Sequence, residues 1–266
     1  MKVAIIQLRS VLDPQKNLAR IDALILAAKE QDPDLQAIFL PEVFYSMSDG
    51  KSLTPYLIEG ENEHFKKIQN IAIKHKLFVL GGSATTRTGD KIFNRSYNFS
   101  PKGVLLGHYD KIHLFSINLK EKQGTTVLDE RKLYAAGKTP KIICVKKFKL
   151  GLSICFDLRF PELFRHYRQA GVDFVSVSSA FTVSTGKAHW LTLLKARAIE
   201  NQIYIVASAQ WGKNNENIST YGHSCIIDPW GDVIANCDEG ENFAIASLSH
   251  KRLEQIRSRM DISAQM

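Results

Sequence analysis

Apolar and polar residues follow one another along this chain in blocks that predict strands and helices in alternation. Short apolar runs bounded by turn-forming residues, such as 2–8 and 150–154, predict buried strands. Longer segments with apolar residues three and four positions apart, such as 14–29, predict amphipathic helices. The pattern places strands at 2–8, 37–40, 78–80, 93–100, 104–108, 141–145, 150–154, 174–177, 203–208, 221–227, 233–236 and 243–247, and helices at 14–29, 62–75, 161–170, 187–201 and 250–258.

The order of these elements predicts an α/β domain built in layers. Strands that alternate with helices indicate parallel sheet, whereas 93–100 and 104–108, joined by Pro101-Lys102-Gly103, predict a hairpin. A polar loop is expected at about 119–139. No linker, low-complexity tract or repeat interrupts the pattern, so residues 1–266 are predicted to form a single domain.

Three of the predicted strands end on a residue that can carry chemistry. Glu42 follows the strand at 37–40 and Pro41, Lys111 follows the strand at 104–108, and Cys155 follows the strand at 150–154. A polar elbow separates Cys155 from a helix that begins at Pro161, a residue suited to the first helical position. Because the ends of parallel strands can converge, we expect a base, a cation and a nucleophile at one site.

Each of these residues also has an ordinary structural interpretation. A cysteine after Leu-Ser-Ile is most often a small buried hydrophobic residue. A lysine after a strand is usually a solvated surface charge, and Glu42 could be a turn carboxylate. The three together favour a reactive site, in which the ammonium of Lys111 and a helix N-terminus are expected to lower the pKa of Cys155.

The ordered set of motifs resembles the nitrilase superfamily of carbon–nitrogen hydrolases. The resemblance covers Val3 to about Ile256 and rests on Leu40-Pro41-Glu42, on Tyr-Asp-Lys-Ile-His-Leu-Phe at 109–115 and on Ile-Cys-Phe-Asp-Leu-Arg-Phe-Pro-Glu at 154–162. Downstream segments are similar to the Nit branch, which holds omega-amidases and deaminated-glutathione amidases; these are 179–181, 188–190, 196–202, 221–224 and 228–231. The resemblance implies an α-β-β-α sandwich of four layers, which agrees with the predicted elements.

The resemblance also implies roles for individual residues. Cys155 would be the nucleophile, and Glu42 would move its proton. Lys111 would face the oxyanion, with the backbone N–H of Phe156 as a second donor. The family places a second glutamate after the lysine; Glu130 is the best match, with neighbouring Asp129 as the alternative register.

Three further residues are candidates for substrate contacts. Arg159, four residues past Cys155, corresponds to an arginine with which related amidases hold a substrate carboxylate, although a salt bridge that packs the elbow is the alternative. Phe181 and Thr185 match the pocket-lining segment of the family, although Phe181 could equally be a core residue. His189 and Trp190 are interpreted as helix-packing residues and are left out of the site.

Composition excludes several other classes. The 266 residues carry a net charge of +8, but the lysines are dispersed and no aromatic-interleaved basic motif occurs, so we expect no nucleic-acid partner. No apolar stretch reaches 18 residues, which predicts no membrane partner. The four cysteines form no CxxC pair, which favours reduced thiols in a cytoplasmic protein, and no ligand spacing indicates a metal or another cofactor.

The activity expected from the resemblance is that of an amidase acting on a small carboxamide that bears a carboxylate, of the deaminated-glutathione amidase type. An omega-amidase acting on alpha-ketoglutaramate or succinamate is the alternative, and an N-carbamoyl-amino-acid hydrolase or a nitrilase is a lesser one. A scaffold that has lost its activity would lack a member of the set Glu42, Lys111 and Cys155, and all three are present. The family's tendency predicts a homodimer.

Overall fold

The computed structural model describes residues 1–121, 124–260 and 262 and contains two β-sheets that face each other. In the described part of the chain the larger sheet has eight strands in the order β18-β1-β2-β4-β6-β5-β3, with β7 paired to β6. The smaller one has six strands in the order β10-β11-β12-β13-β16-β17. The strands of the larger sheet are β1 (Lys2–Gln7), β2 (Ala37–Phe39), β3 (Ile58–Glu59), β4 (Phe78–Leu80), β5 (Ser83–Thr88), β6 (Lys91–Phe99), β7 (Leu105–Asp110) and β18 (Asn242–Ser247), and those of the smaller sheet are β10 (Ile142–Val145), β11 (Phe148–Ile154), β12 (Phe174–Ser179), β13 (Tyr204–Ala209), β16 (Cys225–Ile227) and β17 (Val233–Asn236).

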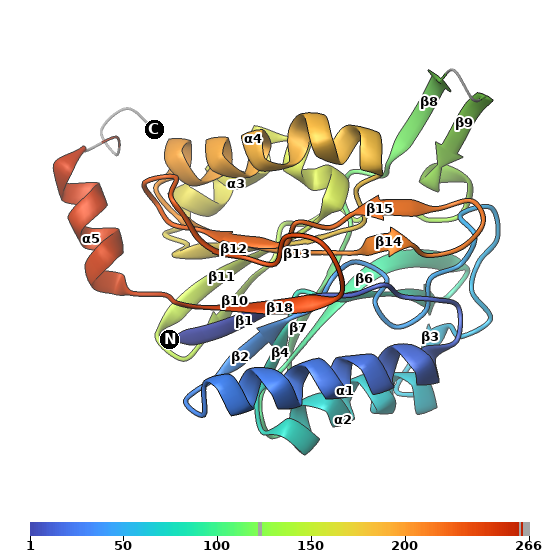
Figure 1. Ribbon diagram of the computed structural model, residues 1–266, viewed down its shortest axis with the longest axis horizontal. Helices are drawn as coiled ribbons and strands as arrows, with labels where there is room; N and C mark the ends of the chain where they lie inside the picture. The colour runs from blue at the N-terminus through green and yellow to red at the C-terminus, as the bar shows by residue number, and fades with distance from the viewer. Residues whose placement is uncertain (122–123, 261, 263–266) are drawn as a thin grey trace.

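Helices cover the outer face of each sheet, as Figure 1 shows. The larger sheet is covered by α1 (Pro14–Gln31) and α2 (Glu63–His75), and the smaller sheet by α3 (Pro161–Gln169) and α4 (Val183–Asn201). A last helix, α5 (His250–Arg259), lies at the end of the sandwich where the N-terminus is found. The predicted α-β-β-α sandwich is therefore confirmed.

The space between the sheets is filled by apolar side chains whose burial holds the two sheets together. The rings of Phe39 on β2 and Phe174 on β12 meet edge to face, with 6.0 Å between their centroids. The hydroxyl of Ser208 on β13 donates a 2.9 Å hydrogen bond to the carbonyl oxygen of Phe39. A second apolar cluster, which includes Ile25 and Ile68, lies between the larger sheet and its helices. The two sheets therefore present fixed edges from which loops can project.

The helix termini follow from local sequence. The side chain of Asp13 accepts a hydrogen bond from the N–H of Gln15 and caps α1, and Pro14 takes the first helical position. Helix α4 begins at Val183, before the predicted start at residue 187, and therefore includes Gly186. A Cβ atom at Gly186 would lie 2.3 Å from the Cβ atom of Tyr221, so glycine allows α4 to approach β15 (Ser219–Tyr221) closely.

Some predicted connections were wrong. The polar loop expected at about 119–139 contains most of a hairpin formed by β8 (Ser116–Glu121) and β9 (Gly124–Asp129), while residues 122–123 lie outside the described residues. The segment was predicted as a loop because it is polar, although it also contains β-branched residues, which favour strands. Figure 1 shows the hairpin projecting from the sandwich beside α4. The loop then continues through a short 3-10 turn, η1 (Glu130–Lys132).

Two other strand predictions needed correction. Strand β5 was missed because its segment, Ser-Ala-Thr-Thr-Arg-Thr, has no apolar run. The single strand predicted at 221–227 is divided into β15 and β16, because Gly222 and His223 adopt φ values of 71° and 57°. Left-handed residues break an extended chain, and β15 pairs instead with β14 (Trp211–Lys213) in a small separate hairpin.

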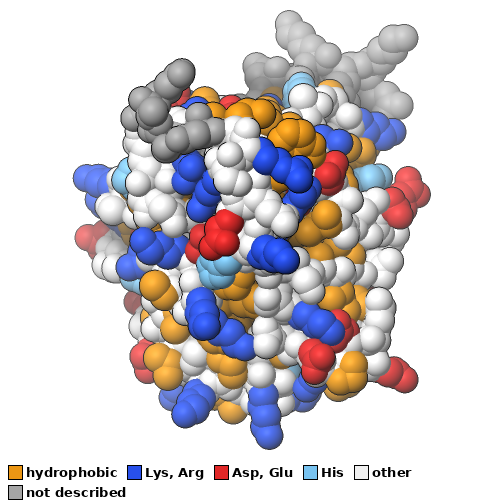
Figure 2. All heavy atoms as spheres, turned by 90° about the vertical axis from the view of Figure 1, so that its left-hand side faces the viewer, with side chains coloured by type: hydrophobic (Ala, Val, Ile, Leu, Met, Phe, Trp, Pro, Cys, Tyr) orange, Lys and Arg blue, Asp and Glu red, His pale blue; other side chains and the backbone are white. Residues whose placement is uncertain are grey.

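The surface at the α5 end carries both charge signs. Figure 2 shows Lys and Arg side chains on this face interspersed with acidic and apolar side chains. Part of the positive charge is paired, since Arg252 of α5 contacts Asp228 at 2.7 Å. No helix in residues 1–121, 124–260 and 262 is long and apolar enough to cross a membrane.

Candidate active site

The thiol of Cys155 lies at the elbow between β11 and α3. Cys155 has a φ of 47°, in the left-handed region, and begins a short 3-10 segment, η2 (Cys155–Arg159), that leads to Pro161. Cys155 is buried, with 7% of its surface exposed. Left-handed backbone at a non-glycine residue is strained and persists only where its surroundings hold it.

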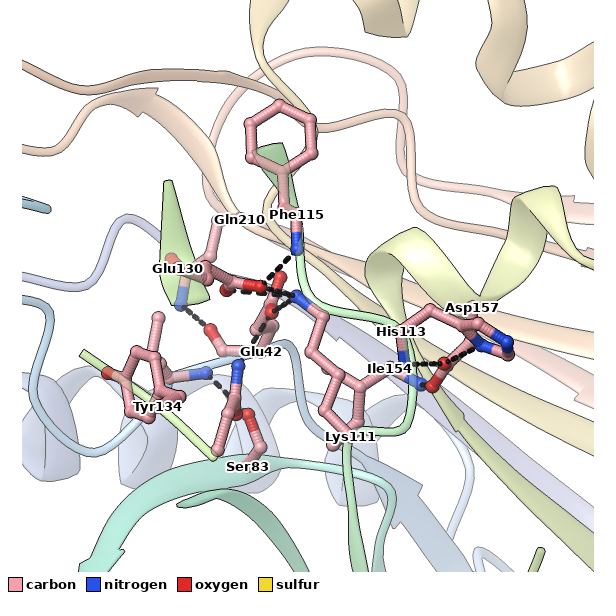
Figure 3. Close-up of polar contacts among 12 residues, drawn as sticks. Glu42, Ser83, Lys111, His113, Phe115, Glu130, Tyr134, Ile154, Asp157 and Gln210 are labelled. Carbon is pink, nitrogen blue, oxygen red and sulfur yellow. Dashed lines mark hydrogen bonds and ion pairs between the residues drawn. The ribbon is translucent and has the colours of Figure 1, made fainter. Parts of the chain in front are cut away.

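The side chain of Asp157 supplies that support. It is fully buried, and its Oδ2 atom accepts hydrogen bonds from the N–H of Ile154 at 2.9 Å and from the hydroxyl of Tyr109 at 2.8 Å. Its Oδ1 atom accepts from the backbone N–H of His113 at 3.0 Å and lies 2.7 Å from the His113 Nδ1 atom. Asp157 therefore joins the cysteine elbow to the segment that follows β7, as Figure 3 shows.

Lys111 begins that segment, and its ammonium lies between two carboxylates. The Nζ atom is 2.7 Å from Glu42 Oε1 and 2.8 Å from Glu130 Oε2. The lysine side chain is 1% exposed, so its charge is balanced by neighbouring side chains and not by bulk water. Figure 3 shows the three side chains pointing toward one another.

Glu42 is held by both sheets. The N–H of Val43 donates to the hydroxyl of Ser83, and Gln210 Nε2 donates a 2.8 Å hydrogen bond to the Glu42 carbonyl oxygen. On the side chain, Asn94 Nδ2 donates a 2.8 Å hydrogen bond to Oε1. The carboxylate is 4% exposed and is fixed in direction by these contacts.

The two acidic candidates after β9 lie in different environments. Glu130 contacts Lys111 and accepts a 2.7 Å hydrogen bond from the N–H of Phe115 at Oε2. Asp129 caps the following turn and pairs with Arg131 at 2.7 Å. The residue against Lys111 is therefore Glu130.

The expected convergence of parallel strand ends was wrong in one respect. Strand β11 is parallel to β12 in the smaller sheet, whereas β2 lies in the larger sheet and β7 is antiparallel to its partner β6. Glu42 and Lys111 therefore reach Cys155 across the sandwich, from the sheet that faces it. The side chains meet where the ends of the two sheets come together.

Burial and charge shift the pKa values of these groups. Burial favours the neutral form of Lys111, but Glu130 and Glu42 outweigh this and hold its pKa well above the ordinary value. Burial, followed by the charge of Glu42, raises the pKa of Cys155 well above its ordinary value, although Lys111 opposes the shift. Burial likewise raises the pKa of Glu130. The expected lowering of the pKa of Cys155 was therefore wrong, because burial and a carboxylate exceed the effect of the ammonium.

A cavity of about 120 Å³ opens beside the thiol. Its walls combine the charged groups with an apolar lining; they include Glu42, Lys111, Glu130, Tyr134, Cys155, Phe156, Arg159, Phe181 and Thr185. All the residues predicted for the site thus line one cavity. Burial raises the pKa of Tyr134, which lines this cavity, to about 12, so its hydroxyl is neutral.

Arg159 lies inside the apolar part of the cavity. Its Cζ atom is 5.7 Å from the ring centroid of Phe156 and 5.3 Å from that of Phe181. Its Nη2 atom is 3.3 Å from His189 Nδ1, a contact that the interpretation of His189 as a packing residue missed. Burial lowers the pKa of Arg159, yet a guanidinium remains charged in proteins. The cavity thus contains a cation that makes no salt bridge to a described carboxylate within 4 Å.

Three contact residues could not be found from the sequence. No contact with the site was predicted for Asn94, Gln210 or Tyr134, and the first two reach Glu42 from positions 52 and 168 residues away in the chain. Only the pairing of the strands brings them to the site. Among the described residues, no group of three or more His, Cys, Asp or Glu could hold a metal ion.

Comparison with known proteins identifies the family. The carbon–nitrogen hydrolase family model matches residues 2–258, and the chain belongs to this family. The chain is 36% identical over 261 residues to the deaminated glutathione amidase of Synechocystis sp. (strain PCC 6803 / GT-S), covering 97% of this chain and 94% of that protein. It is 31% identical to the omega-amidase NIT2 of Bos taurus, covering 99% and 94% of the two chains.

A solved structure gives the same placement. The chain superimposes on Saccharomyces cerevisiae Nit3, described as a member of branch 10 of the nitrilase superfamily, with a TM-score of 0.88 and 30% identity over 99% of this chain and 95% of Nit3. The resemblance to the Nit branch is therefore confirmed, and the chain is a hydrolase of carbon–nitrogen bonds other than peptide bonds.

Proposed function

We propose that this protein is an amidase that converts a small carboxylate-bearing carboxamide and water into a carboxylic acid and ammonia through Cys155. The contact of Lys111 with both Glu42 and Glu130 beside the buried thiol carries the proposal. This arrangement combines a cation for a developing oxyanion with carboxylates that can move protons.

In the first half of the reaction, Glu42 takes the thiol proton as the sulfur attacks the carboxamide carbon. The carbonyl electrons move to oxygen, and the oxyanion is stabilised by Lys111 and the backbone N–H of Phe156. The C–N bond then breaks, Glu42 returns the proton to nitrogen, and ammonia leaves a thioester on Cys155. The raised pKa of Cys155 supports this order, because a thiol that is protonated at rest needs a base.

In the second half, Glu42 takes a proton from water and the hydroxide oxygen attacks the thioester carbon. The C–S bond breaks, the acid is released and the sulfur regains a proton. Glu130 is proposed to hold Lys111 in place through its 2.8 Å contact during both halves. One water is consumed for each amide bond cleaved.

Arg159 is proposed to bind the substrate carboxylate, with Phe181 and Thr185 shaping the cavity around it. Its position in an apolar part of the cavity supports this role, because a weakly hydrated cation can form a forked contact with a carboxylate. The similarity to the Synechocystis protein favours deaminated glutathione as substrate. The similarity to omega-amidase NIT2 supports alpha-ketoglutaramate or succinamate as the alternative.

A panel of substrates tests the proposal. Ammonia release should be measured with deaminated glutathione, alpha-ketoglutaramate, succinamate, N-carbamoyl-alanine and an aliphatic nitrile, using wild type and Cys155→Ala. We expect the first two amides to be turned over best and the variant to be inactive on all of them. Preferred turnover of the nitrile or the carbamoyl compound would overturn the amidase assignment.

We further propose a cytoplasmic homodimer that uses no cofactor and binds neither nucleic acid nor membrane. Four free cysteines support a reducing compartment. Light scattering after size-exclusion chromatography tests the assembly, and a single mass near 30.0 kDa would contradict the dimer.

A further inference from the structure

Asn94 on β6 connects the two charged residues that flank the thiol. Its backbone carbonyl accepts a 3.0 Å hydrogen bond from the N–H of Lys111, and its side-chain Nδ2 donates a 2.8 Å hydrogen bond to Glu42 Oε1. The Asn94 side chain is buried, with 1% exposure. The residue therefore fixes Lys111 through its backbone and Glu42 through its amide.

The two donors on Glu42 use the same oxygen. Asn94 Nδ2 and Lys111 Nζ both contact Oε1, at 2.8 Å and 2.7 Å. No hydrogen bond joins Glu42 Oε2 to any residue in the described part of the chain. Because Oε1 already has two donors, Oε2 is the oxygen that is left to accept a proton.

The amide oxygen of Asn94, in contrast to its amide nitrogen, makes no hydrogen bond within the described part of the chain. This oxygen, Oδ1, is buried. Asn98, four residues along the same strand, is buried to the same degree but is fully used. Its Oδ1 accepts a 2.9 Å hydrogen bond from Gly81 N–H, and its Nδ2 contacts Ser96 Oγ and the Gly107 carbonyl oxygen.

This contrast separates two kinds of asparagine. An unpaired buried acceptor destabilises the folded state, so the side chain of Asn94 is a poor choice for stability alone. Its useful feature is the donor aimed at Glu42. We propose that Asn94 is a positioning residue that stabilises the ionised carboxylate of Glu42 and directs its Oε2 atom to the proton of Cys155, an inference that rests on the proposed role of Glu42 as the base.

The pH dependence of activity offers a test that a merely structural role would leave unchanged. The charged or titratable groups that act on this site are Lys111, Glu130, Cys155, Tyr134 and Arg159. Removal of the Asn94 donor leaves all five in place and takes away one hydrogen bond that stabilises the ionised Glu42 carboxylate. The acidic limb of the kcat/KM profile should therefore move to higher pH.

The experiment compares Asn94→Leu with Asn98→Leu, a matched change on the same strand. For Asn94→Leu we expect kcat/KM at neutral pH to fall at least about 10-fold. We expect the midpoint of the acidic limb of the kcat/KM profile to move about one pH unit higher, the scale of one hydrogen bond to a charged group. Its melting temperature should equal or exceed that of wild type. For Asn98→Leu we expect a lower melting temperature and an acidic limb at the wild-type position.

Two further variants keep the inference falsifiable. Asn94→Ala removes the donor with less bulk and should reproduce the shift if the leucine fails to fold. Asn94→Asp places a second carboxylate beside Glu42 and should move the limb further in the same direction. A wild-type limb in a folded Asn94→Leu or Asn94→Ala protein would overturn the inference. If Glu42→Gln instead retained full turnover, the proposed function would fail independently of any result at position 94.

Discussion

The Nδ1 atom of His113 lies 2.7 Å from the Oδ1 atom of Asp157, and the two residues bridge the segment that carries Lys111 and the elbow that carries Cys155. The imidazole also stacks on Phe160, with 3.6 Å between ring centroids. Because Asp157 also accepts from Ile154 N–H, one buried carboxylate sets the separation of ammonium and thiol.

Asp157→Asn should lower both stability and turnover. An amide NH₂ group cannot accept, so at least one of the donors that now meet Asp157 loses its partner, at a cost of about 1–3 kcal/mol. We expect a lower free energy of unfolding in urea and a kcat reduced at least about 10-fold, because the elbow loses its support. Asp232→Asn is the control, since Asp232 is exposed and its ion pair, with Arg252 at 3.7 Å, is a surface pair that contributes little to stability. Equal behaviour of the two variants would show that the bridge has no such role.

Cys155→Ala should abolish ammonia release while the melting temperature changes little, since one small side chain at the end of a sheet is lost. Cys225→Ala, at a buried cysteine outside the cavity, should keep its activity. Turnover and thermal unfolding of both variants provide the check. Retained turnover in the first variant would remove Cys155 as the nucleophile.

The rate of alkylation should depend steeply on pH. Burial and the charge of Glu42 hold the pKa of Cys155 well above its ordinary value. As long as the pH is below that pKa, each increase of one pH unit raises the thiolate fraction about tenfold. Inactivation by iodoacetamide should therefore accelerate continuously from about pH 6 to about pH 9. Mass spectrometry would distinguish Cys155 from the exposed Cys144. A plateau near neutral pH would instead indicate a thiolate stabilised by Lys111.

Lys111→Met should cost at least about 100-fold in kcat, the scale of losing one oxyanion donor. It should also destabilise the protein by about 3–5 kcal/mol, because Glu42 and Glu130 would be left buried without their cation. Lys213→Met, at an exposed lysine, is the control. Steady-state kinetics and urea unfolding measure the two effects separately. A kcat within a few-fold of wild type would contradict the role in the oxyanion site.

The central residues of the candidate site could be named from the sequence, because each follows an apolar strand. Glu42, Lys111 and Cys155 could be named in this way, and the layered fold followed from the alternation of strands and helices. The sheet to which each strand belongs could not be predicted, since β2 and β11 are both mostly buried strands and neither sequence indicates its sheet. Contacts to Glu42 from distant positions, such as that of Asn94, depend on strand pairing, which local pattern does not encode.

The direction of the pKa shift at Cys155 is a second property that could not be predicted from the sequence. The nearby lysine was predicted correctly as a neighbour, but the depth of burial decides which effect is larger. Side-chain exposure depends on how α4 and the loop after β2 cover the elbow. That packing involves residues such as Ala180 and Val43, whose types carry no chemical signal.

Arg159→Ala should change substrate preference more than it changes general activity. If Arg159 holds a carboxylate in the apolar part of the cavity, its loss leaves that carboxylate without a partner, and kcat/KM for deaminated glutathione and alpha-ketoglutaramate should fall about 100-fold or more. Activity on a neutral amide of similar length should change far less, because the groups around Cys155 are untouched. The ratio of the two kcat/KM values is the quantity to measure.

Arg165→Ala, on the neighbouring helix and outside the cavity, is the matched control and should keep the wild-type ratio. His189→Ala tests whether the 3.3 Å contact helps to aim the guanidinium. We expect it to raise KM for the acidic amides with a smaller effect on kcat, since Arg159 itself remains. An unchanged ratio in Arg159→Ala would remove the carboxylate contact but leave the proposed chemistry of Cys155, Lys111 and Glu42 intact. Equal losses on acidic and neutral amides would instead assign Arg159 to the packing of the elbow.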